Sequence, residues 1–377
     1  MKGKQGLVCM GLLLVLSSCH TGKQITASGL QRKDFQTEVN GQHTDLFTLS
    51  NKQGMEVCIT NYGARVVSIL VPDRNGKRED VVCGFSTITE YMEQRQNFGS
   101  TVGRYIGRIL NARFTLDGVE YKLVPNNGKS GHISHGGNPG FADRIWKVEQ
   151  ADTHRVRLSY LSPDGENGFP GNLKVTLVYS LGEDDNALDL TYEATTDAPT
   201  VLNLSHHSFF NISGNFTKSV EDQQLWVDAD RFTPYDDKKC VTGEYLPVAG
   251  TPLDFRMPHA IGECIDADHP QLKVVNGYDH TWELNTKGDD TRPAAWVYDP
   301  ASGRKMEIFT TEPGMQIYTG NGLKGKMTGK RGIAYPFRSA VCFETMHFQD
   351  SPNQPEFPST VLRPGEVFHS HTVYKFE

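Results

Sequence analysis

Two polar sites inside apolar segments are the strongest candidates for acid–base chemistry. Glu344 ends an apolar run, and His206 and His207 are adjacent within residues 203–211. A carboxylate in such a run is either paired structurally or acts as a base, with its pKa raised by burial and lowered by hydrogen-bond donors. Imidazole titrates near neutral pH and can serve as an acid. Neighbouring residues of a strand point to opposite faces, so we expect at most one histidine to face a given pocket.

Three further residues have the chemistry to bind a polyhydroxylated ligand. Arg108 lies in a glycine-rich apolar stretch, and its fork of donors suits hydroxyls or carboxylates, although a solvated surface arginine is the alternative. His135 precedes two glycines that allow a ligand to approach the backbone, or it is an exposed turn residue. Asp279 lies among aromatic residues, an arrangement that suits a sugar, or it stabilises a turn. We expect no metal site, because neither HExxH nor CxxC is present.

The composition limits the class of protein. The 377 residues carry 38 basic and 45 acidic side chains, a net charge of -7, so nucleic-acid binding is not expected. The hydrophobic fraction of 37% supports a packed core and excludes wholesale disorder. Of the seven cysteines, five lie after residue 19, and this odd, widely scattered set is not a disulfide framework, although one disulfide remains possible.

The body of the chain has the period-two pattern of half-buried strands. Apolar and polar residues alternate over 155–160, 174–179 and 188–194, and residues 182–186 connect the last two as a hairpin. Asp117-Gly118 between two further alternating segments is a strong hairpin signal. Residues 87–94 predict one short helix, with Thr87 and Glu90 spaced as a capping box. These patterns predict one large, all-β, antiparallel domain.

The first residues are typical of an export signal. Two lysines precede an apolar core of about ten residues, and Leu16-Ser17-Ser18-Cys19 resembles a bacterial lipobox, cleaved before Cys19, whose sulfur carries lipid. An ordinary signal peptide with a chance cysteine is the alternative. We expect a signal peptide over residues 1–18, a polar tether over 19–34 and one domain over 35–377. The protein is then exported and faces the periplasm or cell surface, with the lipid on Cys19 as its one membrane contact.

From about residue 45 to residue 376 the sequence resembles the aldose 1-epimerase, or galactose mutarotase, family. The segments that carry the resemblance follow the family's order: Gly107-Arg108-Ile109, His135-Gly136-Gly137, residues 203–211, residues 250–256, Tyr278-Asp279-His280, residues 313–321 and residues 344–355. Each segment alone is weak, but together they are specific.

The resemblance implies a large antiparallel β-supersandwich with the sugar in a cleft on one sheet. It implies interconversion of the α and β anomers of a free aldohexose such as glucose or galactose, with no cofactor and no metal. Glu344 matches the general base that takes the C1 hydroxyl proton, and His207 matches the general acid that protonates the ring oxygen. The matching substrate-binding positions are Arg108, His135, Asp279 and Gln316. A Glu⁻/His⁺ pair is correctly charged for these proton transfers near pH 7.

Three positions depart from the family pattern. Gly107 stands where asparagine commonly precedes the arginine, His206 stands where asparagine is common, and Met346 stands where glutamine is common. Because the acid–base pair is intact, these departures bear on sugar preference rather than on the reaction.

Two other classes of function remain open. A glycoside hydrolase could use Glu344 and Asp279 as paired carboxylates, roughly 5–9.5 Å apart across a glycosidic bond. A non-catalytic sugar-binding lipoprotein would use Arg108, His135 and Asp279 but would have no use for Glu344 with His207.

Overall fold

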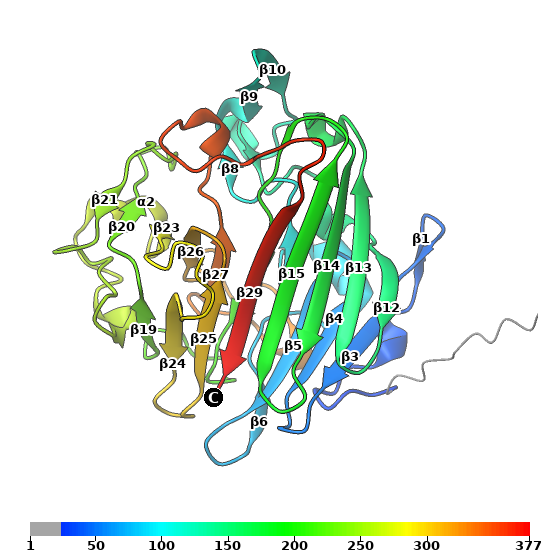
Figure 1. Cartoon of the computed structure of the whole chain (residues 1–377). Helices are drawn as coiled ribbons and strands as arrows, with labels where there is room; N and C mark the ends of the chain where they lie inside the picture. The colour runs from blue at the N-terminus through cyan, green and yellow to red at the C-terminus, as the bar shows by residue number, and fades with distance from the viewer. Residues whose placement is uncertain (1–23) are drawn as a thin grey trace, which may run out of the picture.

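The computed structural model describes residues 24–377, in which antiparallel β-sheets predominate (Figure 1). The largest sheet has nine strands, in the order β12 (Lys147–Ala151), β13 (Arg155–Ser162), β14 (Leu173–Leu181), β15 (Ala187–Thr196), β29 (Phe368–Phe376), β25 (Lys305–Thr310), β24 (Ala295–Tyr298), β19 (Gln224–Val227) and β22 (His259–Ala260). The C-terminal strand β29 lies in the middle of this sheet, between β15 and β25.

Two smaller sheets complete the main framework. A six-stranded sheet has the order β18 (Phe209–Phe210), β27 (Val341–Met346), β26 (Gly314–Tyr318), β23 (Asp279–Glu283), β20 (Arg231–Thr233) and β21 (Leu246–Pro247). A four-stranded sheet has the order β3 (Leu46–Ser50), β4 (Glu56–Thr60), β5 (Arg65–Pro72) and β6 (Arg78–Asp80).

Short paired strands and two short helices lie around these sheets. The strand pairs are β1 (Glu38–Val39) with β2 (Gln42–His43), β7 (Ser100–Val102) with β17 (Ser205–His207), β8 (Arg108–Ile109) with β11 (Ile133–Ser134), β9 (Arg113–Leu116) with β10 (Val119–Lys122), and β16 (Thr200–Val201) with β28 (Val361–Leu362). The α-helices of the described residues are α1 (Ile88–Gln94) and α2 (Pro270–Val275). None of the described helices is long and apolar enough to cross a membrane.

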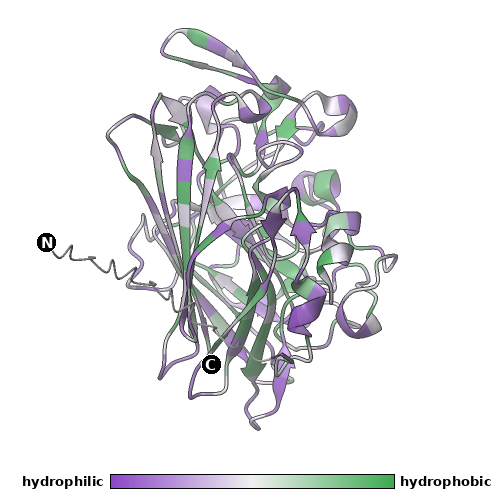
Figure 2. Ribbon diagram, turned by 90° about the vertical axis from the view of Figure 1, so that its right-hand side faces the viewer, coloured by the Kyte–Doolittle hydropathy of each residue, from purple (hydrophilic) through white to green (hydrophobic). Residues whose placement is uncertain are grey.

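The main core contains residues of the nine-stranded, six-stranded and four-stranded sheets. Leu177 and Leu190 of the nine-stranded sheet belong to the same fully buried cluster as Ile317 and Phe343 of the six-stranded sheet. Figure 2 shows apolar residues concentrated along the central strands, with polar residues in the surrounding loops. Because side chains alternate along a strand, the residues between these core positions point to the opposite face of the six-stranded sheet. That opposite face carries the site described below.

The elements expected from local sequence patterns are present. Asp117-Gly118 joins β9 to β10, with Leu116 opposite Val119. Residues 182–186 join β14 to β15. Helix α1 begins after Thr87, whose side chain accepts a hydrogen bond from the Glu90 backbone in a complete capping box. The predictions of an all-β fold and of this helix are confirmed.

The expected tether differs from the structure over its second half. Among residues 24–34, Ile25 bridges to Gln31, and Leu30 is buried in the same cluster as Phe35. The Ser28 backbone N–H donates to Glu56 at 3.2 Å. Burial of Leu30 is favourable and, together with these backbone hydrogen bonds, holds the segment against the body, whereas Ile25 remains exposed. The folded domain therefore includes residues from at least Gln24, whereas Cys19 lies outside the described residues.

Candidate active site

The six residues expected to handle the sugar line one cavity. It has a volume of about 230 Å³, lies on the outer face of the six-stranded sheet, and is lined by Arg108, His135, His207, Asp279, Gln316 and Glu344 among others. Strands β23, β26 and β27 supply Asp279, Gln316 and Glu344 side by side, since Gln316 is opposite both Thr281 and Glu344 in the strand register. The sheet thus brings together residues far apart in the sequence.

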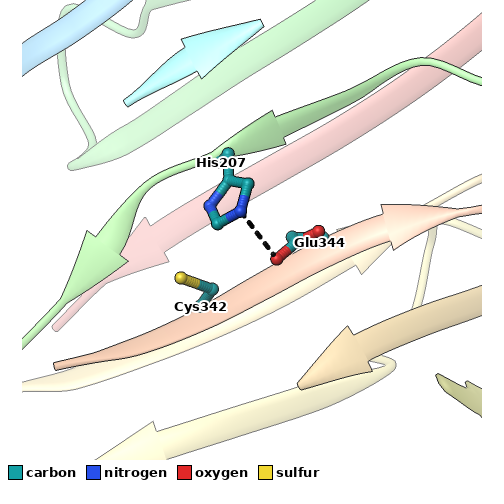
Figure 3. Close-up of side chains that lie close together, drawn as sticks. All are labelled: His207, Cys342 and Glu344. Carbon is teal, nitrogen blue, oxygen red and sulfur yellow. Dashed lines mark ion pairs between the residues drawn. The ribbon is translucent and has the colours of Figure 1, made fainter. Parts of the chain in front are cut away.

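The side chains of His207 and Glu344 approach each other in the wall of the cavity (Figure 3). His207 Nε2 lies 3.4 Å from Glu344 Oε1, and both side chains are more than nine-tenths buried. His207 comes from β17 and stacks on Phe209 with ring centroids 5.0 Å apart, which fixes its plane. The adjacent His206 points into the core instead, where its Nε2 lies 2.6 Å from Ser208 Oγ. One of the two histidines therefore faces the cavity, as expected for neighbours on a strand.

Burial changes the protonation of this pair. It raises the pKa of the Glu344 carboxyl well above its usual value, and nearby Asp279 raises it further. It also lowers the pKa of the His207 imidazole well below its usual value, and neighbouring His135 adds to this. In the sugar-free cavity the neutral forms are therefore favoured over the expected Glu⁻/His⁺ charges, because burial penalises each charge. The two forms differ only in the position of one proton, which lies on Glu344 in the neutral pair and on His207 in the ion pair. One proton is therefore available for transfer in either form.

His135 acts as a neutral donor beside this pair. Burial, with the charge of Arg108, lowers its pKa to about 4. The Gly107 backbone N–H donates to His135 Nδ1 at 3.4 Å, so the ring proton is on Nε2. The following Gly136 has a positive φ of 79°, and a Cβ there would be 2.0 Å from the Gly103 carbonyl oxygen. Only glycine fits this turn, which holds His135 in place.

A chain of amide and hydroxyl groups covers the other side of the cavity. Gln316 Nε2 donates to Asp279 Oδ1 at 2.7 Å, and Thr281 Oγ1 donates to Gln316 Oε1 at 2.5 Å. Gln349 Nε2 donates to the Tyr235 hydroxyl at 2.6 Å. Burial raises the pKa of Asp279, although Arg108 and Gln316 oppose this. These contacts orient carboxylate and amide groups that can bind sugar hydroxyls.

Gln349 is a cavity residue that the sequence analysis missed. Its Oε1 accepts a hydrogen bond from the Arg108 backbone N–H at 3.2 Å, and its side chain lies directly over Gly107. A Cβ at residue 107 would lie 2.5 Å from Gln349 Cγ. Glycine at 107, in place of the commonly expected asparagine, was the signal that another side chain occupies this space. Met346, another departure, also lines the cavity.

We expect Gly107→Asn to be tolerated only when Gln349 is shortened. Residue 107 has φ +76°, which asparagine accepts better than most residues, so the main obstacle is the Gln349 side chain. The single substitution should lower the free energy of unfolding by about 1–3 kcal/mol through overpacking. It should also raise the KM for the expected sugar substrate, because it disturbs the cavity. Gly107→Asn with Gln349→Ala should recover most of both losses in urea unfolding and polarimetry.

Gly118→Asn is the matched control, because Gly118 has φ +79° with no atom within 4 Å of an added Cβ. Equal losses in Gly107→Asn and Gly118→Asn would show that backbone strain, and not Gln349, limits residue 107.

The side chains at this site also include the one group of three possible metal ligands found among residues 24–377. His207, Cys342 and Glu344 place their ligand atoms within 4.8 Å of one another (Figure 3). The described cysteines, Cys58, Cys83, Cys240, Cys264 and Cys342, are all free, so no disulfide forms among them.

Comparison with known proteins assigns the family. The model of the aldose 1-epimerase family matches residues 45–375. The chain belongs to the aldose 1-epimerase family. It is 39% identical over 330 residues to galactose mutarotase of Sus scrofa, covering 88% of this chain and 93% of that protein. It is 37% identical over 340 residues to aldose 1-epimerase of Escherichia coli (strain K12), covering 89% of this chain and 96% of that protein.

Solved structures agree with this assignment of the epimerase family. An aldose epimerase homologue from C. elegans superposes with a TM-score of 0.81 at 31% identity, covering 89% of this chain and 99% of that one. Galactose 1-epimerase from Lactobacillus acidophilus NCFM gives a TM-score of 0.78 at 28% identity, covering 90% of this chain and 96% of that one. The predictions of the family, of the mutarotase-like β fold and of an isomerase are confirmed.

Proposed function

We propose that Glu344 and His207 are the acid–base pair with which this epimerase interconverts the α and β anomers of a free aldohexose. The observation that carries the proposal is the 3.4 Å approach of His207 Nε2 to Glu344 Oε1 in the wall of the cavity. Two groups that share one proton at this distance can serve the two oxygens of one hemiacetal carbon. We propose Arg108, His135, Asp279 and Gln316 as the residues that bind the sugar hydroxyls.

The reaction follows from moving two protons between these groups and the sugar. Glu344, as the carboxylate, takes the proton from the C1 hydroxyl while His207, as the imidazolium, gives its proton to the ring oxygen. The bond between C1 and the ring oxygen breaks, and C1 becomes an aldehyde carbon. Rotation about C1–C2 presents the other face of the aldehyde, and the same two groups reverse their transfers to close the ring. Each well-placed acid or base contributes typically about 10²–10⁴-fold.

A bound sugar can stabilise the charged forms of Glu344 and His207. In the sugar-free cavity the pair's proton is favoured on the carboxyl, because burial disfavours both charges. Sugar hydroxyls that donate to Glu344 stabilise its carboxylate, so the pair's proton moves to His207. Neutral His135 adds a donor beside His207 without adding a charge that would repel the imidazolium.

Polarimetry tests the proposal directly. The protein should accelerate the optical-rotation change of freshly dissolved α-D-glucose or α-D-galactose. A glycoside hydrolase would instead release the leaving group of an aryl glycoside, and a sugar-binding protein would leave the anomerisation rate unchanged. No acceleration with either hexose, or with a panel of other anomerically pure aldoses, would contradict the proposal.

We expect a bell-shaped pH profile for kcat/KM. As the pH falls through the lowered pKa of His207, the pair gains a second proton and Glu344 can no longer act as a base. As the pH rises through the raised pKa of Glu344, the pair loses its only proton and His207 can no longer act as an acid. Each limb should change about tenfold per pH unit, and both apparent pKa values belong to the pair. A rate that rises on acidification through about pH 6.5, as for an isolated imidazolium, would contradict this coupling.

We further propose that the mature chain is an exported lipoprotein, anchored through lipid on Cys19. The support is the residue pattern at 16–19, together with the ordered packing that begins by Gln24. Five residue steps join Cys19 to Gln24, and a fully extended chain of this length spans at most about 18 Å. The anchor would therefore hold the domain within about this distance of the lipid surface. In a bacterial host, the full chain should fractionate with membranes and incorporate a labelled fatty acid. The Cys19→Ala variant should not incorporate the labelled fatty acid. Labelling of this variant to the same extent as the wild-type chain would overturn the proposal.

A further inference from the structure

We propose that His207, Cys342 and Glu344 form a binding site for one thiophilic divalent cation such as Zn²⁺, which excludes the sugar and so inhibits the epimerase. The binding of the cation rests on the geometry of these three side chains alone. The inhibition also rests on the function proposed above, because the cation would occupy the acid–base pair.

The separations suit a tetrahedral ion. Zn–N and Zn–O bonds of about 2.0–2.1 Å at a tetrahedral angle separate the two ligand atoms by about 3.4 Å. His207 Nε2 and Glu344 Oε1 are already 3.4 Å apart. The third ligand atom, Cys342 Sγ, lies within 4.8 Å of the other two. A Zn–S bond of about 2.3 Å would place it about 3.6 Å from them, so the thiol must lie at or move to that separation when the ion binds.

The strands hold these ligands on one side. Cys342 and Glu344 are two residues apart on β27, so their side chains share one face of the sheet. His207 approaches the same face from β17, and its ring is kept in plane by stacking on Phe209. All three residues are buried, which means that packing and not solvent sets their positions. A site held this way loses little conformational entropy when the ion binds.

The donor set selects the class of ion. Imidazole nitrogen, thiolate sulfur and carboxylate oxygen together suit Zn²⁺, Co²⁺ and related ions, whereas Mg²⁺ and Ca²⁺ require oxygen ligands. His207 Nδ1 is buried and has no hydrogen-bond partner among the described residues, so it can carry the ring proton and leave the Nε2 lone pair for the ion. Binding releases two protons to solvent, one from the Cys342 thiol and one from the His207–Glu344 pair.

The fourth position of the ion would face the cavity. Glu344 and His207 line the cavity, whereas Cys342 lies behind them and is fully buried. An ion bound here takes the lone pairs with which the two catalytic groups would exchange protons with the sugar. We therefore expect inhibition that is competitive with the aldose.

Cobalt(II) is the probe for binding, because a Co²⁺–thiolate bond produces near-ultraviolet charge-transfer absorption whether or not the enzyme turns over. The wild-type chain should bind one Co²⁺ with this band, and Zn²⁺ should displace it. Cys342→Ser should lose the band and bind Zn²⁺ at least about tenfold more weakly, since even supporting groups of metal sites contribute about 10–100-fold. Cys58→Ser is the matched control, because Cys58 is an equally buried free cysteine that does not belong to the group of His207, Cys342 and Glu344.

Activity provides the second measurement. Zn²⁺ should raise the apparent KM of the wild-type and Cys58→Ser enzymes, while Cys342→Ser should keep its basal rate and resist Zn²⁺ by at least about tenfold. Cys342→Ala repeats the test if the serine variant fails to fold. Equal Zn²⁺ sensitivity of wild type and a folded Cys342 variant, or Co²⁺ binding without the thiolate band, would overturn the cation site. A thiolate band in a chain without anomerase activity would retain the cation site and refute the proposed function instead.

Discussion

Glu344→Gln is expected to lower kcat for anomerisation by about 10²–10⁴-fold, with a small change in KM. The amide has nearly the same shape as the carboxyl, so the cavity wall beside His207 is kept. It cannot take a proton from the C1 hydroxyl, and the pair then lacks its base. The initial rate of optical-rotation change for α-D-glucose or α-D-galactose, measured over a range of concentrations, separates kcat from KM.

Glu312→Gln is the matched control for this substitution. Glu312 is also a buried glutamate beside a histidine, with His347 Nδ1 2.7 Å from its Oε2, but it does not line the cavity. Glu312→Gln should affect stability while leaving the anomerisation rate of the folded protein near that of the wild type. Full activity in Glu344→Gln would refute the role proposed for Glu344.

His207→Asn should lower kcat by a similar factor, about 10²–10⁴-fold, because the substitution removes the imidazole that is paired with Glu344 and proposed to protonate the ring oxygen. Burial lowers the pKa of His135 to about 4, and it is His207, not His135, that is paired with Glu344 and can share its proton. Polarimetry with the same sugars measures the loss, and added imidazole should restore part of the rate by entering the space left by the ring.

Combining the two substitutions distinguishes a coupled pair from two independent groups. If Glu344 and His207 act as one unit, the double variant should be little slower than either single variant, because one missing partner already disables the other. His347→Asn, which alters the partly buried Glu312–His347 pair, is the control for nonspecific damage. Losses that multiply in the double variant would show that the groups act independently.

The predictions from local pattern succeeded where neighbouring residues decide the structure. The alternation in residues 174–179 and 188–194 is that of β14 and β15, and Thr87 with Glu90 caps α1. These signals are short-range, because strand faces, tight turns and helix ends depend on residues only a few positions apart. The tether boundary was missed for the opposite reason, since burial of Leu30 depends on distant residues of the body.

The amino-acid sequence by itself determined several of the strands, the all-β class, the family and the types of residue available for acid–base chemistry. Only the tertiary structure decided that His207 meets Glu344 from another sheet, that Cys342 lies beside them, and that Gln349 fills the space over Gly107. Its burial of the pair also raises the pKa of Glu344 and lowers that of His207, which favours the neutral forms over the charges expected from ordinary pKa values. The physical reason is that contact and desolvation depend on which surfaces meet, and strands far apart in the chain meet only when the whole sandwich closes.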